Sequence, residues 1–158
     1  MENISEHITY EEAICSETAI EKHIDNTPTA PIIGTMKLTA GKIFEPLRKW
    51  VSELRGHDSP ITINSFYRSP ELNKAIGGAQ DSQHTRGEAI DLNVNYPDFN
   101  KKDLFELIRT EFDFDQLIYE GGTPDDPAWV HVSYSSVHNR KECLKMVMHG
   151  GKPTYTLL

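Results

Sequence analysis

Two side chains that are both suited to bind a metal ion lie seven residues apart in the middle of the chain. His84 lies in a polar segment, and Asp91 lies in an alternating apolar segment that predicts a strand. A loop that turns at Gly87 and re-enters a sheet can bring the imidazole and the carboxylate together. Both groups are good zinc ligands. Taken alone, the pair could equally be a loop histidine and a solvated aspartate.

A third candidate ligand lies in residues 128–134, whose alternation predicts another strand. Trp129, His131 and Ser133 would share one face of this strand, and two valines would share the other. Because the valines resemble core residues, His131 is expected to face a polar site. Three protein ligands leave a fourth position for water, which is typical of a catalytic zinc rather than a structural one.

Hydrolysis at such a zinc also needs a proton acceptor and a group that stabilises the attacked carbonyl. Zinc lowers the pKa of its water to roughly 7, and a carboxylate can then act as general base. Glu120 ends a predicted strand, and antiparallel pairing with the His131 strand would bring it near the metal. Asp125 and Asp126 in the following loop are the next candidates. Arg68 could stabilise the developing negative charge.

The segments that carry these residues resemble the M15 family of zinc peptidases over roughly residues 35–134. They read Ser65-Phe66-Tyr67-Arg68-Ser69-Pro70-Glu71-Leu72-Asn73, Ser82-x-His84-x-x-Gly87-x-Ala89-x-Asp91 and Trp129-Val130-His131-Val132-Ser133. The family includes D-alanyl-D-alanine carboxypeptidases, vancomycin-resistance D,D-dipeptidases and phage L-alanyl-D-glutamate endolysins. Its fold is shared by the Hedgehog signalling domain.

The resemblance implies a role for each of these side chains. The Zn²⁺ ligands would be His84, Asp91 and His131. Arg68 would polarise the scissile carbonyl or hold substrate, although it could also be a surface cation or a partner of Glu71. A further residue, Ser82, would help bind the substrate's peptide or carboxylate, although it could simply cap the loop backbone.

The general base is where the sequence departs from several members of the family. Those members place an acidic residue or a histidine two or three positions before the last ligand, where this chain has Ala128 and Trp129. Glu120 matches instead a Tyr-Glu pair that precedes the histidine strand in Hedgehog-like members, with a longer loop between. It could also be a solvated strand end. Trp129 shares the predicted face of His131 and could line the substrate cleft.

The composition is that of a globular domain and excludes several kinds of partner. A length of 158 residues suits one domain, with the motif-bearing core at about residues 35–150. The net charge of -8 repels nucleic acid and anionic membranes alike. Two cysteines without a Cys-x-x-Cys pair argue against zinc held by thiolates. We expect a monomer.

The start of the chain suggests where the protein is made. It has neither the basic region nor the apolar core of a secretory signal. No run approaches the roughly 18 apolar residues needed to span a bilayer. We therefore expect cytoplasmic synthesis, with action on the cell wall only after release or lysis.

Helices are predicted mainly in the first part of the chain and strands in the later part. Thr9 and Glu12 form a candidate capping box for a helix over residues 10–23. Apolar residues spaced by three and four predict a long helix from about 36 to 56, in which Pro46 makes a kink or marks a junction of two helices. Further helices are predicted at 70–76 and 101–112, and strands at 61–66, 89–94, 117–119, 129–134 and 144–148. This order predicts an α+β fold of the Hedgehog and D-Ala-D-Ala-peptidase type, with N-terminal helices packed on a mainly antiparallel sheet.

Two functions from different classes follow. The first is a zinc metallopeptidase that hydrolyses a peptide bond in peptidoglycan stem peptides, as a D-Ala-D-Ala carboxypeptidase or an endopeptidase, with zinc-activated water as nucleophile. The second is a non-catalytic zinc-bound phage structural or wall-binding module, since Hedgehog shows that the fold permits one. The presence of Glu120 and Arg68 favours the enzyme. Fold-level analogy cannot decide between them, and the bond that is cut stays open.

Overall fold

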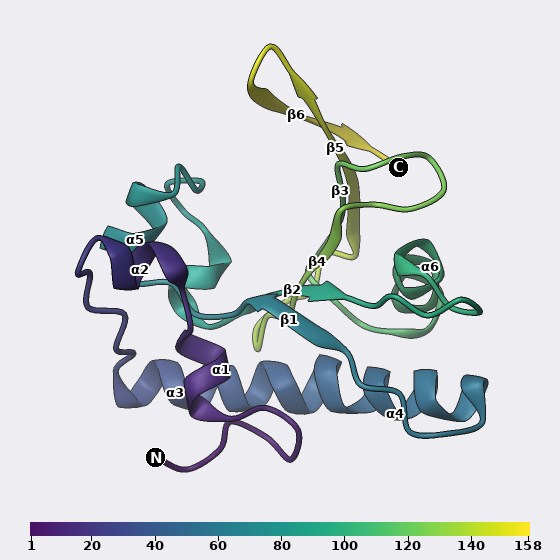
Figure 1. The fold of residues 1–158 in the computed structure, drawn as a ribbon, viewed down its shortest axis with the longest axis horizontal. Helices are drawn as coiled ribbons and strands as arrows, with labels where there is room; N and C mark the ends of the chain where they lie inside the picture. Colours follow the sequence, from purple (N-terminus) through teal and green to yellow (C-terminus); the bar gives the residue numbers. More distant parts are fainter.

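A computed structural model describes residues 1–158 and shows a six-stranded sheet with its long helices on one face (Figure 1). The strand order is β1-β2-β4-β3-β5-β6. Neighbouring strands are antiparallel except β3 and β5, which are parallel. The predicted α+β class is confirmed, and the mainly antiparallel sheet contains one parallel pair. The strands are β1 (Thr62–Ser65), β2 (Ala89–Asn93), β3 (Gln116–Glu120), β4 (Trp129–Ser133), β5 (Glu142–His149) and β6 (Lys152–Leu157).

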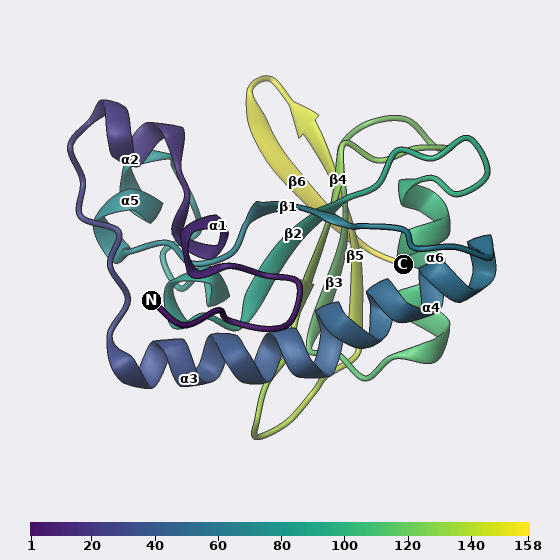
Figure 2. The same ribbon diagram turned by 60° about the horizontal axis from the view of Figure 1, so that its bottom comes forward.

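The long helix is a nearly continuous rod made of α3 (Ala30–Thr39), η1 (Ala40–Phe44) and α4 (Glu45–Arg55) (Figure 2). Pro46 has no N–H to donate to the carbonyl four residues earlier. The N–H of Glu45 instead reaches the carbonyl of Ala40, five residues back, which is a π-helical turn. Pro46 therefore marks a junction, at the start of α4, rather than a sharp kink of the rod. Neither this rod nor any other helix is long and apolar enough to cross a membrane.

The prediction of one helix over residues 10–23 is wrong. The structure has two short helices, α1 (Tyr10–Ile14) and α2 (Glu17–Glu21). The predicted capping box of Thr9 and Glu12 is present at the start of α1. Ser16 is extended and its hydroxyl accepts a hydrogen bond from the N–H of Ala19, so a side-chain cap replaces helix continuation at this point.

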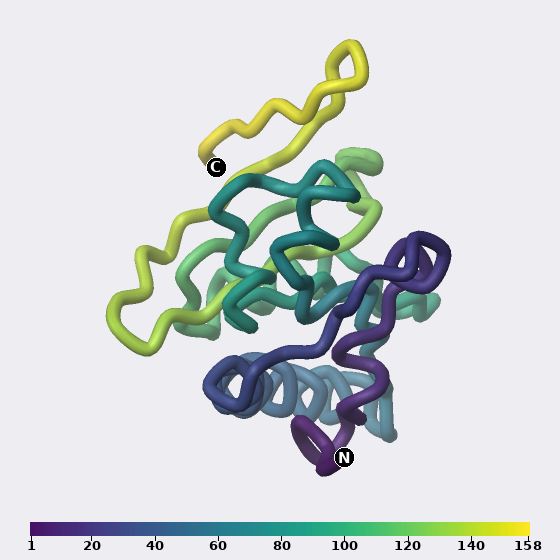
Figure 3. The backbone as a smooth tube through the Cα atoms, turned by 90° about the vertical axis from the view of Figure 1, so that its left-hand side faces the viewer, coloured from purple at the N-terminus to yellow at the C-terminus, as the bar shows by residue number.

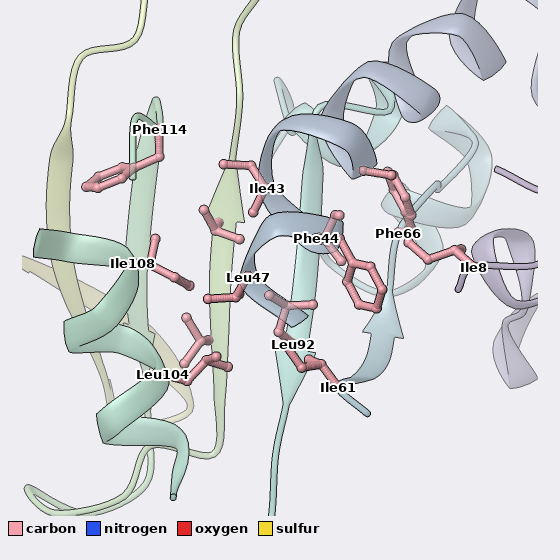
Figure 4. Packing of buried hydrophobic residues seen from close by; sticks show 14 of the residues in the cluster. Ile8, Ile43, Phe44, Leu47, Ile61, Phe66, Leu92, Leu104, Ile108 and Phe114 are labelled. Atoms are coloured by element: carbon pink, nitrogen blue, oxygen red, sulfur yellow. The ribbon is translucent and has the colours of Figure 1, made fainter. Parts of the chain in front are cut away.

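The hydrophobic core lies between the sheet, the helical rod and α6 (Lys101–Glu111) (Figure 4). Ile43 and Leu47 of the rod lie close to Leu104 and Ile108 of α6 and to Leu92 of β2. Their side chains are fully buried. The three long helices thus cover the same face of the sheet.

Alternation along the strands places the candidate site residues on the opposite face. Val130 and Val132 are fully buried in the core, as the valine pattern predicts, so His131 between them points away from it. Asp91 lies opposite His131 across β2 and β4, and Glu120 lies opposite Trp129 across β3 and β4. We call this side of the sheet the outer face.

The C-terminal strands form a hairpin that projects from the molecule at the end opposite the N-terminus (Figure 3). β5 contains the strand predicted at 144–148, but no predicted element corresponds to β6. Gly150 and Gly151, both with positive φ, form the turn between them. Because a Gly-Gly pair between two extended segments is itself a hairpin signal, the sequence contained the information needed to predict β6.

Candidate metal centre

Three buried side chains converge on the outer face. His84 comes from the short helix η2 (Gln83–Arg86), Asp91 from β2 and His131 from β4. Their potential ligand atoms all lie within 4.8 Å of one another. The Oδ1 atom of Asp91 is 3.2 Å from Nε2 of His84 and 3.0 Å from Nδ1 of His131. The structure thus brings together the three residues that the sequence proposed as ligands.

The donor set and its spacing fit a zinc ion. Two atoms that each lie about 2.0–2.1 Å from one tetrahedral ion are about 3.3 Å apart, close to the two separations observed. The Nδ1 atom of His84 is 2.7 Å from the carbonyl oxygen of Phe66. Because a carbonyl only accepts, Nδ1 carries a proton and Nε2 can present its lone pair to Asp91. The lone pairs of Nε2 of His84 and Oδ1 of Asp91 then face each other, and this contact is favourable only with a proton or a cation between the two atoms.

The electrostatic environment keeps Asp91 ionised. Burial acts to raise the pKa of Asp91, but the charge that His84 carries when no cation is bound and its nitrogen is protonated, together with the hydrogen bonds between Asp91 and both histidines, outweighs burial and holds this pKa well below its usual range. Arg68 adds a hydrogen bond from Nη2 to the Oδ2 atom of Asp91, at 3.1 Å. An ionised carboxylate is the form that binds a metal.

The loop that carries His84 is held against both the helical rod and the sheet. Gly87 has a φ of +74°, and a Cβ atom there would lie 2.6 Å from the Cγ atom of Met36. The hydroxyl of Thr39 donates to the carbonyl of Gly87 at 3.0 Å. On the other side, the amide of Gln83 donates to the Oδ2 atom of Asp115 at 2.9 Å. These contacts fix the path of the loop around the histidine.

Gly87→Ala is expected to destabilise the protein. A left-handed backbone and overpacking against α3 together cost about 2–5 kcal/mol. The free energy of unfolding in urea measures this loss. Gly34→Ala is the matched control, because Gly34 lies inside α3 and a Cβ atom there meets nothing within 4 Å. This control is expected to raise stability by about 0.5–1 kcal/mol, and equal effects of the two substitutions would contradict the argument.

Ser82 lies at the start of η2, where its side chain acts as a cap. Its Oγ atom accepts a hydrogen bond from the N–H of His84 at 3.3 Å. This contact corresponds to the capping alternative that the sequence left open. The contact of Ser82 with substrate stays a prediction.

Arg68 lies beside the candidate ligands and does not pair with Glu71. Its guanidinium donates to Ser65 at 3.0 Å, to Asn73 at 3.3 Å and to Asp91 at 3.1 Å. A guanidinium has five N–H groups, so two remain for a substrate. Arg68 also borders a cleft of about 410 Å³ formed by residues of α1, α2, β1 and α5 (Pro70–Ala75). The bond to Asp91 is a link that the sequence did not predict.

Arg68→Ala is expected to lower turnover more than it lowers metal affinity. Loss of a donor to the attacked carbonyl typically costs about 10²–10³ in kcat, whereas loss of a group that orients a ligand costs about 10–100-fold in affinity. Steady-state kinetics and chelator competition measure the two effects. Arg48→Ala removes an arginine that pairs with the exposed Asp58 and should change neither quantity. Complete zinc loss from an intact Arg68→Ala fold would assign this arginine to ligand orientation alone.

Glu120 ends β3 on the outer face, on the strand next to that of His131, as predicted. The residue is 6% exposed, and no side chain donates to its carboxylate, whereas Arg68 donates to that of Asp91. Burial is the largest effect on Glu120 and raises its pKa to about 7. Among the nearby charges, His131 and Arg68 act to lower this pKa, whereas Asp91 acts to raise it. A carboxylate that titrates near neutrality is suited to general-base work.

The other candidates for the base face elsewhere. Asp126 pairs with Lys101 at 3.1 Å and Asp125 with Lys102 at 3.6 Å, both at the start of α6. That helix packs on the core face of the sheet, so the structure favours Glu120. Trp129 is half-buried opposite Glu120 and shares the outer face with the histidine ligand of β4.

A buried His-Asp-His cluster beside an unpaired buried carboxylate, on the open face of an α+β sheet, defines the site of a metal-dependent hydrolase. Residues 6–133 match the family described as Peptidase M15. The chain belongs to this family, which makes it a metallopeptidase, and the match confirms the resemblance found in the sequence. No curated protein matches the chain.

Proposed function

We propose that this protein is a zinc-dependent peptidase that hydrolyses a peptide bond in peptidoglycan stem peptides, as a D-Ala-D-Ala carboxypeptidase or an endopeptidase. The observation that carries the proposal is the cluster of His84, Asp91 and His131, whose ligand atoms lie within 4.8 Å of one another beside Glu120. Peptidases of the M15 family are typically zinc-dependent, which supports zinc as the metal. The Hedgehog-type fold is part of the same proposal.

The side chains around the centre divide the chemical work. A zinc ion held by the three ligands would supply Lewis-acid polarisation and make water at the site more acidic. Glu120 accepts the proton of the attacking water and delivers it to the leaving amine. The two free N–H groups of Arg68 stabilise the negative charge that develops on the carbonyl oxygen. Trp129 and Ser82 contact the bound peptide.

Recognition of the substrate is proposed to be local. A net charge of -8 gives no long-range attraction to an anionic wall polymer. The peptide must therefore be held by the groups that border the centre, including Arg68. We propose that the protein acts as a monomer, without a nucleic-acid or membrane partner, and meets the wall after release or lysis.

Digestion of purified muropeptides by the zinc-loaded protein, followed by mass spectrometry, tests this function. We expect one product whose mass identifies the bond that is cut. Protein stripped of metal with a chelator should produce none, and added zinc should restore the product. If every stem peptide and every D-Ala-D-Ala substrate stays intact, a non-catalytic zinc-bound module becomes the better description.

A further inference from the structure

The β5–β6 hairpin lies beyond the family match, which ends at residue 133, yet it extends the same sheet as the metal centre. Glu120 of β3 lies opposite Met146 of β5, and Met146 lies opposite Tyr155 of β6. Paired residues on neighbouring strands point to the same face of a sheet. Tyr155 is therefore on the outer face, in the same row as the candidate base.

The backbone register places Tyr155 two strands from the candidate base, Glu120. Neighbouring strands are about 4.8 Å apart, so two strand spacings separate the backbones of Tyr155 and Glu120 by about 10 Å. Burial and, after it, the charges of Glu120 and Asp91 raise the pKa of the Tyr155 phenol, as expected for a side chain on the same face as both carboxylates. The hairpin also curves away from α6, toward the side on which α2 and α5 lie (Figure 1).

The outer face of the hairpin is apolar and partly open. Its cross-strand pairs carry no charge, and Glu142 at the start of β5 is the charged residue of the hairpin on this face; the paired residues are Leu144, Met146, Met148, Pro153, Tyr155 and Leu157. Tyr155 is 51% exposed, while Met146 beneath it is 7% exposed. Exposed apolar side chains that adjoin a polar centre mark a binding surface. A peptide lying across the centre would meet the cation Arg68 on one side and an uncharged wall on the other.

We propose that the outer face of this hairpin is a wall of the substrate cleft and that Tyr155 is a specificity-determining residue. The inference rests on the proposed function, because its ligand is the stem peptide. The ring of Tyr155 packs on an uncharged residue such as alanine, and its hydroxyl donates a hydrogen bond to a peptide carbonyl. Carboxylates of the peptide are then directed toward the Arg68 side of the centre.

Kinetics on the stem pentapeptide L-Ala-D-Glu-L-Lys-D-Ala-D-Ala test the role of Tyr155. Tyr155→Ala is expected to raise KM about tenfold, as the loss of one aromatic contact does, while kcat and zinc affinity stay at the wild-type level. Tyr155→Phe retains the ring and should recover most of the lost affinity. Thr156→Ala alters the same strand on its opposite face and should leave KM unchanged. A KM for Tyr155→Ala equal to that of wild type overturns the proposal.

A binding measurement separates this inference from the proposed function. Fluorine NMR of 3-fluorotyrosine-labelled Glu120→Gln protein reports on the six tyrosines, and Tyr155→Phe identifies the signal of Tyr155. We expect the pentapeptide to shift this signal. A shift without cleavage by wild-type protein supports the binding wall and overturns the peptidase function. Cleavage without a shift, and with unchanged KM, overturns the wall alone. Neither cleavage nor shift overturns both.

Discussion

Replacing His84 with alanine is expected to abolish zinc binding and peptidase activity together. The remaining Asp91 and His131 offer two ligands, whereas zinc sites in proteins have three or four. The buried cluster consists of His84, Asp91 and His131, so it holds no fourth ligand to replace Nε2 of His84. Elemental analysis after dialysis measures the zinc content, and muropeptide digestion measures the activity.

A second histidine provides the control for this result. His138 is exposed, and His138→Ala should retain both zinc and activity. Circular dichroism and thermal unfolding show whether the His84→Ala protein is folded. His131→Ala provides an independent test, since it removes a ligand from the sheet rather than from the loop. Full zinc occupancy in folded His84→Ala protein would contradict the proposed ligand set.

The direction of the strand residue His131 could be predicted from the sequence because strand parity is a local property, whereas His84 was proposed from a loop turning at Gly87 and from the family resemblance. A buried valine stands on each side of His131 in the sequence. Because alternate residues of a strand face opposite ways, His131 must point away from the core wherever the strand is placed. The same reasoning applies to Glu120, whose strand must return toward His131 after a short loop. These predictions needed the type of each element and its order in the chain, but no knowledge of loop conformation.

Contacts made by loops and by distant side chains were beyond such reasoning. The bond from Arg68 to Asp91 joins residues 23 positions apart, and Arg68 follows a strand whose register shifts between Ile63 and Ser65. The cap made by Ser82 depends on the conformation of η2. Periodicity carries no information on either contact. Residue Tyr155 was missed for a different reason, because the Gly-Gly turn that creates its strand was not used.

Glu120→Gln is expected to lower kcat about 10²–10⁴-fold while the protein keeps its zinc, because general acid–base catalysis contributes about that much. The amide has nearly the same shape as the carboxylate but cannot accept the proton of water. Glu120 is not one of the three clustered ligands, so its loss leaves the metal-binding atoms in place. Single-turnover kinetics on the stem peptide and elemental analysis of the same sample measure the two quantities.

The pH dependence of wild-type activity gives an independent check on the same carboxylate. A base must be deprotonated to work, so activity should rise with pH through the pKa of Glu120, which burial raises to about 7 in the metal-free protein. A bound cation favours the carboxylate and moves this midpoint to lower pH. The residual activity of Glu120→Gln should no longer fall at low pH, so the acid limb of the pH profile should be absent. Asp125→Asn, which alters an exposed partner of Lys102, should leave both the acid limb and kcat unchanged. If Glu120→Gln retained full kcat and the same acid limb, another group would have to take the proton, and the assignment of Glu120 as general base would be wrong.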